Sequence, residues 1–269
     1  MRILKILLII LLAVVTLAYG TTEITSRLSG TNDTPVISCD SDTLEISVSA
    51  DRQVLLESVT ASDAQDGDLT SAIRISGISK FIDDATTKIT YLVFDSDNNV
   101  GSLTRTIRYT DYVSPRISIT EPLVYSSGEN IVLLDRLLVE DCIDGDITDS
   151  VRVSTLNSSN ETAVYSMDLR VTNSMDDTVQ LTLPVVRYPD NAEHPEITLT
   201  SYLVYLEQGS SFSPRDYVSY VRTSDGIIGK TEVRVSGSVD TSVSGTYMVR
   251  YSYIHNGVEG IALLTVVVE

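Results

Sequence analysis

The sequence contains no tryptophan and only three phenylalanines, although it has 14 tyrosines. Two histidines and two cysteines leave few side chains for nucleophilic catalysis or for a zinc site. Basic residues are also scarce: 19 lysines and arginines face 37 acidic residues, and the formal net charge is −18. An acidic surface repels phosphate groups, so the composition argues against binding to nucleic acid or to anionic lipid.

Only the N-terminus has a long hydrophobic run. Residues 6–18 are apolar apart from one threonine, and Arg2 and Lys5 precede them. A positively charged start, an apolar run and small residues before Thr21 are typical of a secretory signal peptide. The run is short for the roughly 20 residues of a membrane span. We predict that residues 1–20 are a signal peptide or an uncleaved anchor, which places the rest of the chain at the cell surface or outside the cell.

The remainder of the chain repeats itself. The segments TPVIS, SPRIS and HPEIT contain Pro35, Pro115 and Pro195, which lie 80 residues apart. Each proline follows a short polar link and precedes alternating aliphatic residues, as at the start of a strand, where the missing N–H is least costly. Because the links are short and end in proline, we expect a semi-rigid rod of repeated domains.

Each repeat contains the same two signals. The octets DAQDGDLT (63–70) and DCIDGDIT (141–148) follow the first two prolines, and a reduced form at Asp225 and Gly226 follows the third. Two alternating apolar runs separated by a turn rich in glycine, asparagine or aspartate come later, which predicts a β-hairpin. The segments 54–62 and 132–140 occupy matching places and are predicted as strands. About seven short strands per repeat is the rhythm of an immunoglobulin-like sandwich.

The sequence therefore predicts an all-β protein of three tandem immunoglobulin-like β-sandwich domains. A signal or anchor segment (1–20) and a polar spacer (21–33) precede them. The predicted domains are residues 34–113, 114–193 and 194–269. The third is a degenerate copy, because its octet lacks the flanking acidic residues.

The pattern D-x-x-D-G-D-[IL]-T of both octets resembles the immunoglobulin-like repeats of bacterial surface and secreted proteins. Those repeats also begin with proline before alternating aliphatic residues, and end in a tyrosine-rich hairpin with a turn such as FDSDNNVG in the first repeat. The resemblance covers residues 34–269 with decreasing fidelity. It implies an immunoglobulin-like fold and an extracellular role, and no particular reaction.

Two interpretations of the octets stay open. In the preferred one, Gly67 and Gly145 allow a tight reversal and the neighbouring aspartates accept backbone N–H bonds. In the other, carboxylate oxygens bind calcium, and no other cofactor is expected. The candidate ligands are Asp63, Asp66, Asp68, Asp141, Asp144 and Asp146. The hairpin turn with Asp95 and Asp97 is expected at the same end of the sandwich as the first octet, although the spacing is not that of an EF-hand loop.

The cysteines also leave two possibilities. An even count in an oxidising compartment favours a Cys39–Cys142 disulfide, but their unmatched places in the repeats favour two small free thiols. His194 and His255 have no nucleophile at motif spacing, so we expect no enzymatic activity.

We expect a non-catalytic structural or adhesive module of a bacterial cell surface. The alternatives are a module that binds extracellular glycan and a subunit of a larger surface assembly, joined through exposed strand edges. The expected partners are other surface proteins or extracellular glycan, with membrane contact only through residues 1–20.

Overall fold

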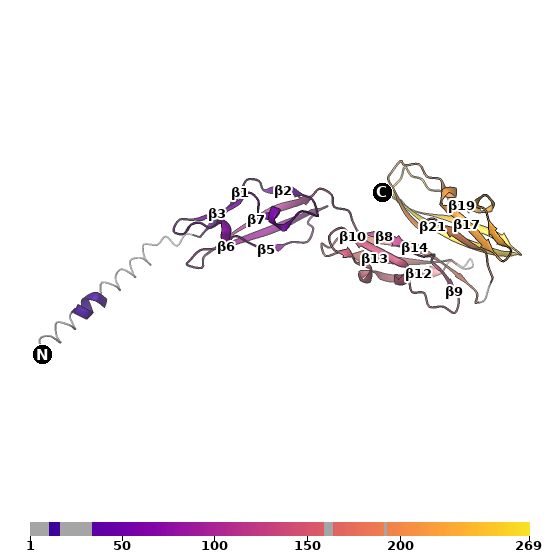
Figure 1. Cartoon of the computed structure of the whole chain (residues 1–269), viewed down its shortest axis with the longest axis horizontal. Helices are drawn as coiled ribbons and strands as arrows, with labels where there is room; N and C mark the ends of the chain where they lie inside the picture. Colours follow the sequence, from indigo (N-terminus) through magenta and orange to yellow (C-terminus); the bar gives the residue numbers. More distant parts are fainter. Residues whose placement is uncertain (1–10, 17–33, 159–163, 191–192) are drawn as a thin grey trace. The chain divides into compact units, whose positions relative to one another are not determined.

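The computed structural model describes residues 11–16, 34–158, 164–190 and 193–269 (Figure 1). Residues 11–16 are helical, and the rest of the predicted signal segment and spacer lies outside the described residues. Among the described helices, none has the length and apolar character that crossing a membrane requires. The remaining described chain consists of β-strands, short 3-10 segments and turns, which confirms the all-β prediction. It divides into two compact units, Met1–Thr110 and Asp111–Glu269.

The first unit contains one sandwich, in which a three-stranded sheet packs on a four-stranded sheet. The smaller sheet has the order β1 (Val36–Cys39), β3 (Val59–Asp63) and β4 (Gly67–Asp68). The larger sheet has the order β2 (Thr43–Ile46), β7 (Val100–Tyr109), β6 (Thr86–Phe94) and β5 (Arg74–Ile78). β2 pairs in parallel with β7, and the other pairs are antiparallel.

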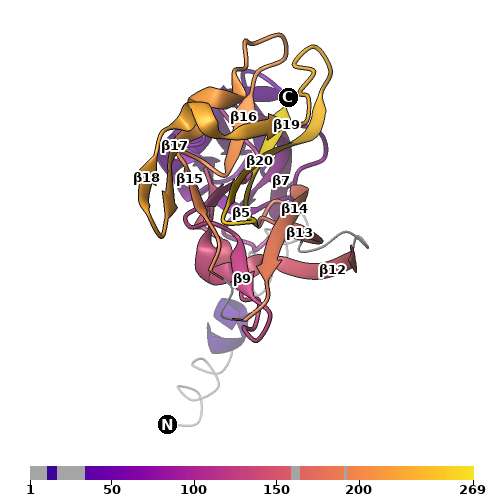
Figure 2. The same cartoon turned by 90° about the vertical axis from the view of Figure 1, so that its right-hand side faces the viewer.

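The second unit contains two sandwiches with the same plan. The second sandwich consists of β8 (Arg116–Ile119), β10 (Leu137–Asp141) and β11 (Gly145–Asp146) against β9 (Val124–Ser126), β14 (Thr178–Tyr188), β13 (Val164–Thr172) and β12 (Arg152–Ser158). In the third sandwich, the smaller sheet consists of β15 (Glu196–Leu199), β17 (Val218–Thr223) and β18 (Gly226–Ile228), which Figure 2 shows side by side. The larger sheet has the order β16 (Leu203–Leu206), β21 (Val258–Val268), β20 (Gly245–His255) and β19 (Arg234–Ser236). The parallel pairing recurs as β9 with β14 and β16 with β21.

Short 3-10 segments interrupt two of the predicted strands. The segment η1 (Arg52–Leu56) precedes β3, and η3 (Leu134–Arg136) precedes β10. η1 begins where the Asp51 carboxylate accepts the Gln53 N–H at 2.8 Å. The prediction of continuous strands over 54–62 and 132–140 is therefore wrong in the first part of each segment.

Two buried tyrosines fix the same corner in two sandwiches. Tyr91 donates its hydroxyl to the carbonyl oxygen of Leu55 at 2.5 Å, and Tyr251 donates to that of Pro214 at 2.7 Å. Both side chains are fully buried. Each hydroxyl bonds to a carbonyl group within a 3-10 segment, η1 in the first sandwich and η5 (Pro214–Tyr217) in the third, and so ties that segment to the hairpin across the core.

The entry strands of the first and third sandwiches lie against a glycine. A Cβ atom at Gly101 on β7 would collide with the backbone of Pro35, and one at Gly260 on β21 would collide with that of Pro195. The proline that begins each of these two sandwiches is thus packed against its last strand.

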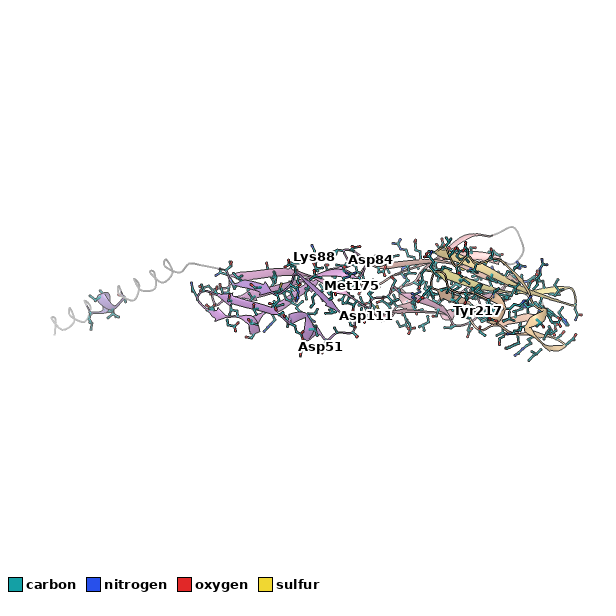
Figure 3. The ribbon with its side chains drawn as sticks, turned by 90° about the horizontal axis from the view of Figure 1, so that it is seen from above. Asp51, Asp84, Lys88, Asp111, Met175 and Tyr217 are labelled. Atoms are coloured by element: carbon teal, nitrogen blue, oxygen red, sulfur yellow. The ribbon has the colours of Figure 1, made fainter. Side chains whose placement is uncertain are left out.

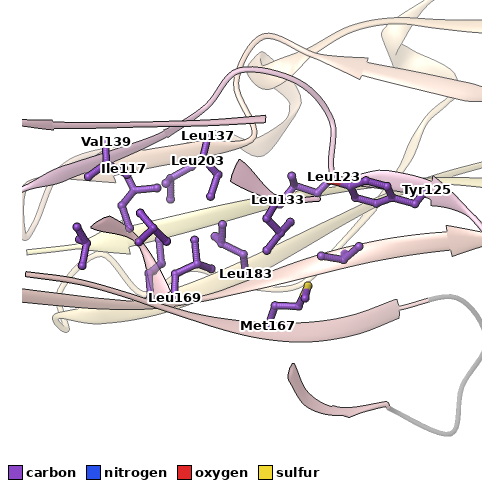
Figure 4. Close-up of a cluster of buried hydrophobic side chains, with 14 residues drawn as sticks. Ile117, Leu123, Tyr125, Leu133, Leu137, Val139, Met167, Leu169, Leu183 and Leu203 are labelled. Carbon is purple, nitrogen blue, oxygen red and sulfur yellow. The ribbon is translucent and has the colours of Figure 1, made fainter. Parts of the chain in front are cut away.

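The second and third sandwiches share a buried apolar seam. Val186 and Tyr188 on β14 form one cluster with Ile261 and Leu263 on β21. The Ile261 N–H donates to the Tyr188 hydroxyl at 2.6 Å. Leu203 of the third sandwich belongs to the core cluster of the second, where Figure 4 shows it beside Ile117 and Leu137.

Polar contacts border this seam. The Ile117 N–H donates to the Tyr205 hydroxyl at 3.2 Å. The Arg116 guanidinium lies over the Tyr205 ring, 4.3 Å from its centroid, and also pairs with the Glu269 carboxylate. The second and third sandwiches are therefore joined by a packed interface as well as by the linker. The sequence predicted only the short linkers.

We predict that Leu263→Asp uncouples the second and third sandwiches. It places a charge in the apolar seam, where an unpaired carboxylate is strongly unfavourable. Wild-type unit 2 is expected to unfold in one transition by calorimetry, and the variant in two. The matched control is Thr104→Asp, at the corresponding exposed position of β7. A single unchanged transition in Leu263→Asp would show that the seam does not couple the two sandwiches.

Candidate functional site

The first octet forms a tight reversal between β3 and β4. Gly67 has φ +75°, a conformation that glycine adopts without strain. One oxygen of Asp63 accepts the N–H groups of Gln65 at 2.7 Å and Asp66 at 3.0 Å. Asp68 accepts the Thr70 N–H at 2.9 Å. These carboxylates therefore satisfy the backbone of their own turn.

Asp66 instead reaches across to the hairpin turn between β6 and β7. Its two oxygens accept the Ser96 N–H at 2.6 Å and the Ser96 hydroxyl at 2.9 Å. The octet and the hairpin turn thus lie at the same end of the sandwich, as the sequence predicted. In the turn itself, Asp95 accepts the Asn99 N–H at 2.7 Å.

The same bridge occurs in the second sandwich. Asp144 accepts the Ser174 N–H at 2.6 Å and the Ser174 hydroxyl at 2.7 Å, in the turn that also carries Met175 (Figure 3). In both sandwiches the aspartate precedes its serine by 30 residues. This fixed spacing is visible in the sequence, but neither octet taken alone contains it.

The second octet is more buried than the first. Asp141, only 5% exposed, accepts the N–H groups of Ile143 at 2.9 Å and Asp144 at 2.8 Å. Its other oxygen accepts from the side-chain amide of Asn173, which also donates to the Tyr112 hydroxyl. Tyr112 donates in turn to Asp177 at 2.7 Å. Burial, followed by the neighbouring Asp177, raises the pKa of Tyr112, so this link residue stays protonated and docked.

The remaining candidate ligand, Asp146, repeats the role of Asp68. One of its oxygens accepts the Thr148 N–H at 2.9 Å and the Thr148 hydroxyl at 2.7 Å. The hydroxyl of Thr148, then its N–H, holds the pKa of Asp146 below its usual value, and Thr70 does the same for Asp68. The N–H groups of Asp66 and Gln65 lower the pKa of Asp63. These three carboxylates are stabilised in their charged form by neighbouring hydrogen-bond donors.

The third sandwich replaces the serine of the bridge with histidine. Asp225 lies 3.2 Å from Nε2 of His255, again 30 residues later, and the Ser224 hydroxyl lies 3.2 Å from the same nitrogen. The sequence shows no nucleophile at motif spacing from His255, and the fold brings the Ser224 hydroxyl to it from a separate loop. The arrangement is nevertheless unlike a catalytic triad, in which the carboxylate orients the base through the opposite ring nitrogen. Here serine and aspartate share one nitrogen.

The other residues singled out in the sequence lie apart from these turns. His194 stacks on the Tyr188 ring, with centroids 3.6 Å apart. Both cysteines are free thiols: Cys39 donates to the Ser41 carbonyl and Cys142 to that of Val113. Across the described ranges, no group of three or more histidine, cysteine, aspartate or glutamate side chains is arranged to hold a metal ion. The calcium interpretation of the six aspartates stays open, and the turn interpretation stays the preferred one.

Comparison with known proteins supports a surface immunoglobulin-like domain in the third repeat. Residues 199–268 match a family model described as "Bacterial surface protein, Ig-like domain". An uncharacterized 81.3 kDa protein of Acholeplasma phage L2 is 27% identical over 229 residues, which cover 81% of this chain and 30% of that protein. This chain therefore spans less than a third of the length of that relative.

Solved structures with similarity come from two different kinds of protein. One is the M60 catalytic domain with the CBM51-1 and CBM51-2 domains of Clostridium perfringens ZmpB, with 12% identity, a TM-score of 0.24, and coverage of 87% of this chain and 30% of that one. Another is Drosophila N-cadherin EC1-4, with 11% identity, a TM-score of 0.22, and coverage of 68% and 57%. The family match, limited to the third repeat, supports an extracellular surface module.

We predict that Asp63→Asn weakens the acid sensitivity of the first sandwich. The folded-state pKa of Asp63 is lowered, so its contribution to stability is complete above its unfolded pKa and is lost as the pH falls through the folded value. Asparagine keeps the accepting oxygen but not the charge. The intrinsic rate of amide exchange falls with pH, so the quantity compared is the protection factor relative to that rate. The protection factors of peptides covering residues 59–70 should decrease less in the variant than in the wild type between about pH 5 and about pH 3. Glu45→Gln is the control, and equal acid responses in all three proteins would contradict the prediction.

We further expect no binding of calcium to the octets, because all six aspartates already accept backbone N–H bonds. Calorimetric titration of the full chain should give no heat, and millimolar calcium should leave the melting temperature unchanged. A bound ion at about 100 times its Kd would add about 2.7 kcal/mol of stability. Binding heat that disappears in Asp66→Asn and Asp144→Asn would establish the calcium interpretation instead.

Proposed function

We propose that this chain is a non-catalytic extracellular module of a bacterial cell surface, which holds its exposed loops and sheet faces away from its point of attachment. The observation that carries the proposal is the match of residues 199–268 to a bacterial surface immunoglobulin-like domain. The same sandwich plan occurs in all three repeats of the described chain.

The seam between the second and third sandwiches supports a role as a stiff spacer. Ile261 is 7% exposed, Leu263 is 8% exposed and Val186 is 2% exposed. Burial of such side chains contributes roughly 1.5 to 3 kcal/mol each. A pair of domains joined in this way resists bending more than a pair joined by a link alone.

The chemistry of the acidic turns supports a non-catalytic module. Asp63, Asp68 and Asp146 have lowered pKa values, whereas a general acid at neutral pH requires a raised one. The imidazole of His255 contacts serine and aspartate through a single nitrogen, so the carboxylate does not orient it as a base.

We predict that the repeats are accessible from outside intact cells. Brief protease treatment of whole cells should release peptides from residues 34–269, while a cytosolic protein measured in parallel stays intact. N-terminal sequencing of the extracted protein then distinguishes release from tethering: a start at Thr21 indicates a cleaved signal peptide, and Met1 indicates an anchor. Protection of all three repeats until the cells are lysed would refute a surface location.

A further inference from the structure

The outer face of the second sandwich carries two arginines directly opposite each other. Arg152 on β12 pairs in register with Arg170 on β13, and Arg170 pairs with Gln180 on β14 (Figure 1). All three side chains are exposed. Like charges at directly opposed positions of an antiparallel pair destabilise a sheet, so this arrangement is unfavourable by itself.

Neither guanidinium is neutralised within the protein. Over the described ranges, no carboxylate lies within 4.0 Å of Arg152 or Arg170, and neither side chain donates a hydrogen bond. Asp168, two residues before Arg170, accepts the Thr182 hydroxyl at 2.5 Å. In a chain with a net charge of −18, two neighbouring arginines without an acidic partner are unusual.

The other sandwiches show that the fold does not require this pair. In the first, Arg74 occupies the place of Arg152 but donates to the carbonyl groups of Ser71 and Ile73, and Leu92 stands opposite it. In the third, Arg234 stands opposite Ser252. Arg170 is therefore a second positive charge that only this sandwich has at that position.

The pair lines a polar depression of about 470 Å³. Its polar lining consists of Arg152, Ser154, Asp168, Arg170, Gln180 and Thr182, together with Thr246 of the third sandwich. The Asp168 carboxylate accepts the Thr182 hydroxyl and pairs with neither arginine. The volume is within the range of roughly 300 to 1,000 Å³ for small-molecule sites. Hydroxyl and amide groups beside two guanidinium groups provide hydrogen-bond partners for a ligand that carries both acidic groups and hydroxyls.

We propose that this face binds an acidic saccharide, with a carboxylate or sulfate group held between Arg152 and Arg170. Guanidinium groups bind planar and tetrahedral oxyanions through paired N–H donors, and an anion between the two arginines removes their mutual repulsion. Sugar hydroxyls would bond to Ser154, Gln180 and Thr246. Saccharide binding goes beyond the proposed function as a surface spacer. It is independent of that function, because a spacer needs no ligand.

Calorimetric titration of the full chain at about 0.05 M NaCl tests the site with three probes of equal length. These are an oligogalacturonate hexamer, a chondroitin sulfate hexasaccharide and neutral maltohexaose. We expect binding of the carboxylated probe, the sulfated probe or both, weakening at higher salt, and no binding of maltohexaose. The first two probes distinguish carboxylate from sulfate recognition.

Two substitutions localise the binding. Arg170→Leu introduces the residue that the first sandwich has at this place, and it should lower the affinity about tenfold or more, because a charge-assisted bond is lost. Arg108→Gln removes the same charge from an exposed strand of the first sandwich and should leave the affinity unchanged. Circular dichroism checks that both variants are folded.

Three results would overturn the proposal. The first is no heat with either acidic probe at millimolar concentration, and the second is an equal loss of affinity in Arg108→Gln and Arg170→Leu. The third is binding of a hexaglutamate peptide as tight as that of the saccharides, since this would show a site for any polyanion. None of these results bears on surface accessibility, so the two proposals fail separately.

Discussion

Each sandwich depends on the alternation of buried and exposed side chains along its long hairpin. On β6, Ile89, Tyr91 and Val93 are fully buried, and the intervening residues face outward. A slip of one residue would exchange these two sets, so the alternation fixes the register of the hairpin against β7. With the register fixed, the turn at the end of the hairpin is placed where the octet aspartate reaches it.

The outward faces of the hairpins are free to differ because the fold does not depend on them. Ser102 and Thr104 are exposed on β7, and the corresponding residues of β21, Ile261 and Leu263, are buried against β14. On β13 the outward-facing Arg170 lines the polar depression of the second sandwich. The same hairpin therefore presents a polar surface in the first sandwich, an arginine pair in the second and a domain interface in the third. Only the outward-facing residues differ in character, while the inward-facing residues stay apolar.

Much of the fold was predictable from local patterns, because alternation, proline at strand starts and glycine in reversals act over a few residues. The 3-10 segments at 52–56 and 134–136 were not, since neither RQVLL nor LDR carries a local pattern that distinguishes a short 3-10 turn from the start of the following strand. Burial of β21 on both faces could be predicted from the sequence. The segment IALLTVVV lacks the apolar–polar alternation of a strand with one solvent-exposed face. The contact of Ser224 with His255 could not be predicted, because it depends on the relative placement of two loops 31 residues apart.

The glycines at the starts of two sandwiches have a consequence for how such arrays grow. Gly260 leaves room for the backbone of Pro195, and Gly101 does so for Pro35, while Val179 stands at this place in the second sandwich. Proline and glycine are far apart in the chain but form one steric unit. A hybrid sandwich that combined Pro35 or Pro195 with a last strand bearing a larger side chain at the glycine position would place a Cβ atom against the proline backbone, so exchange of strands among such repeats has to keep both residues together.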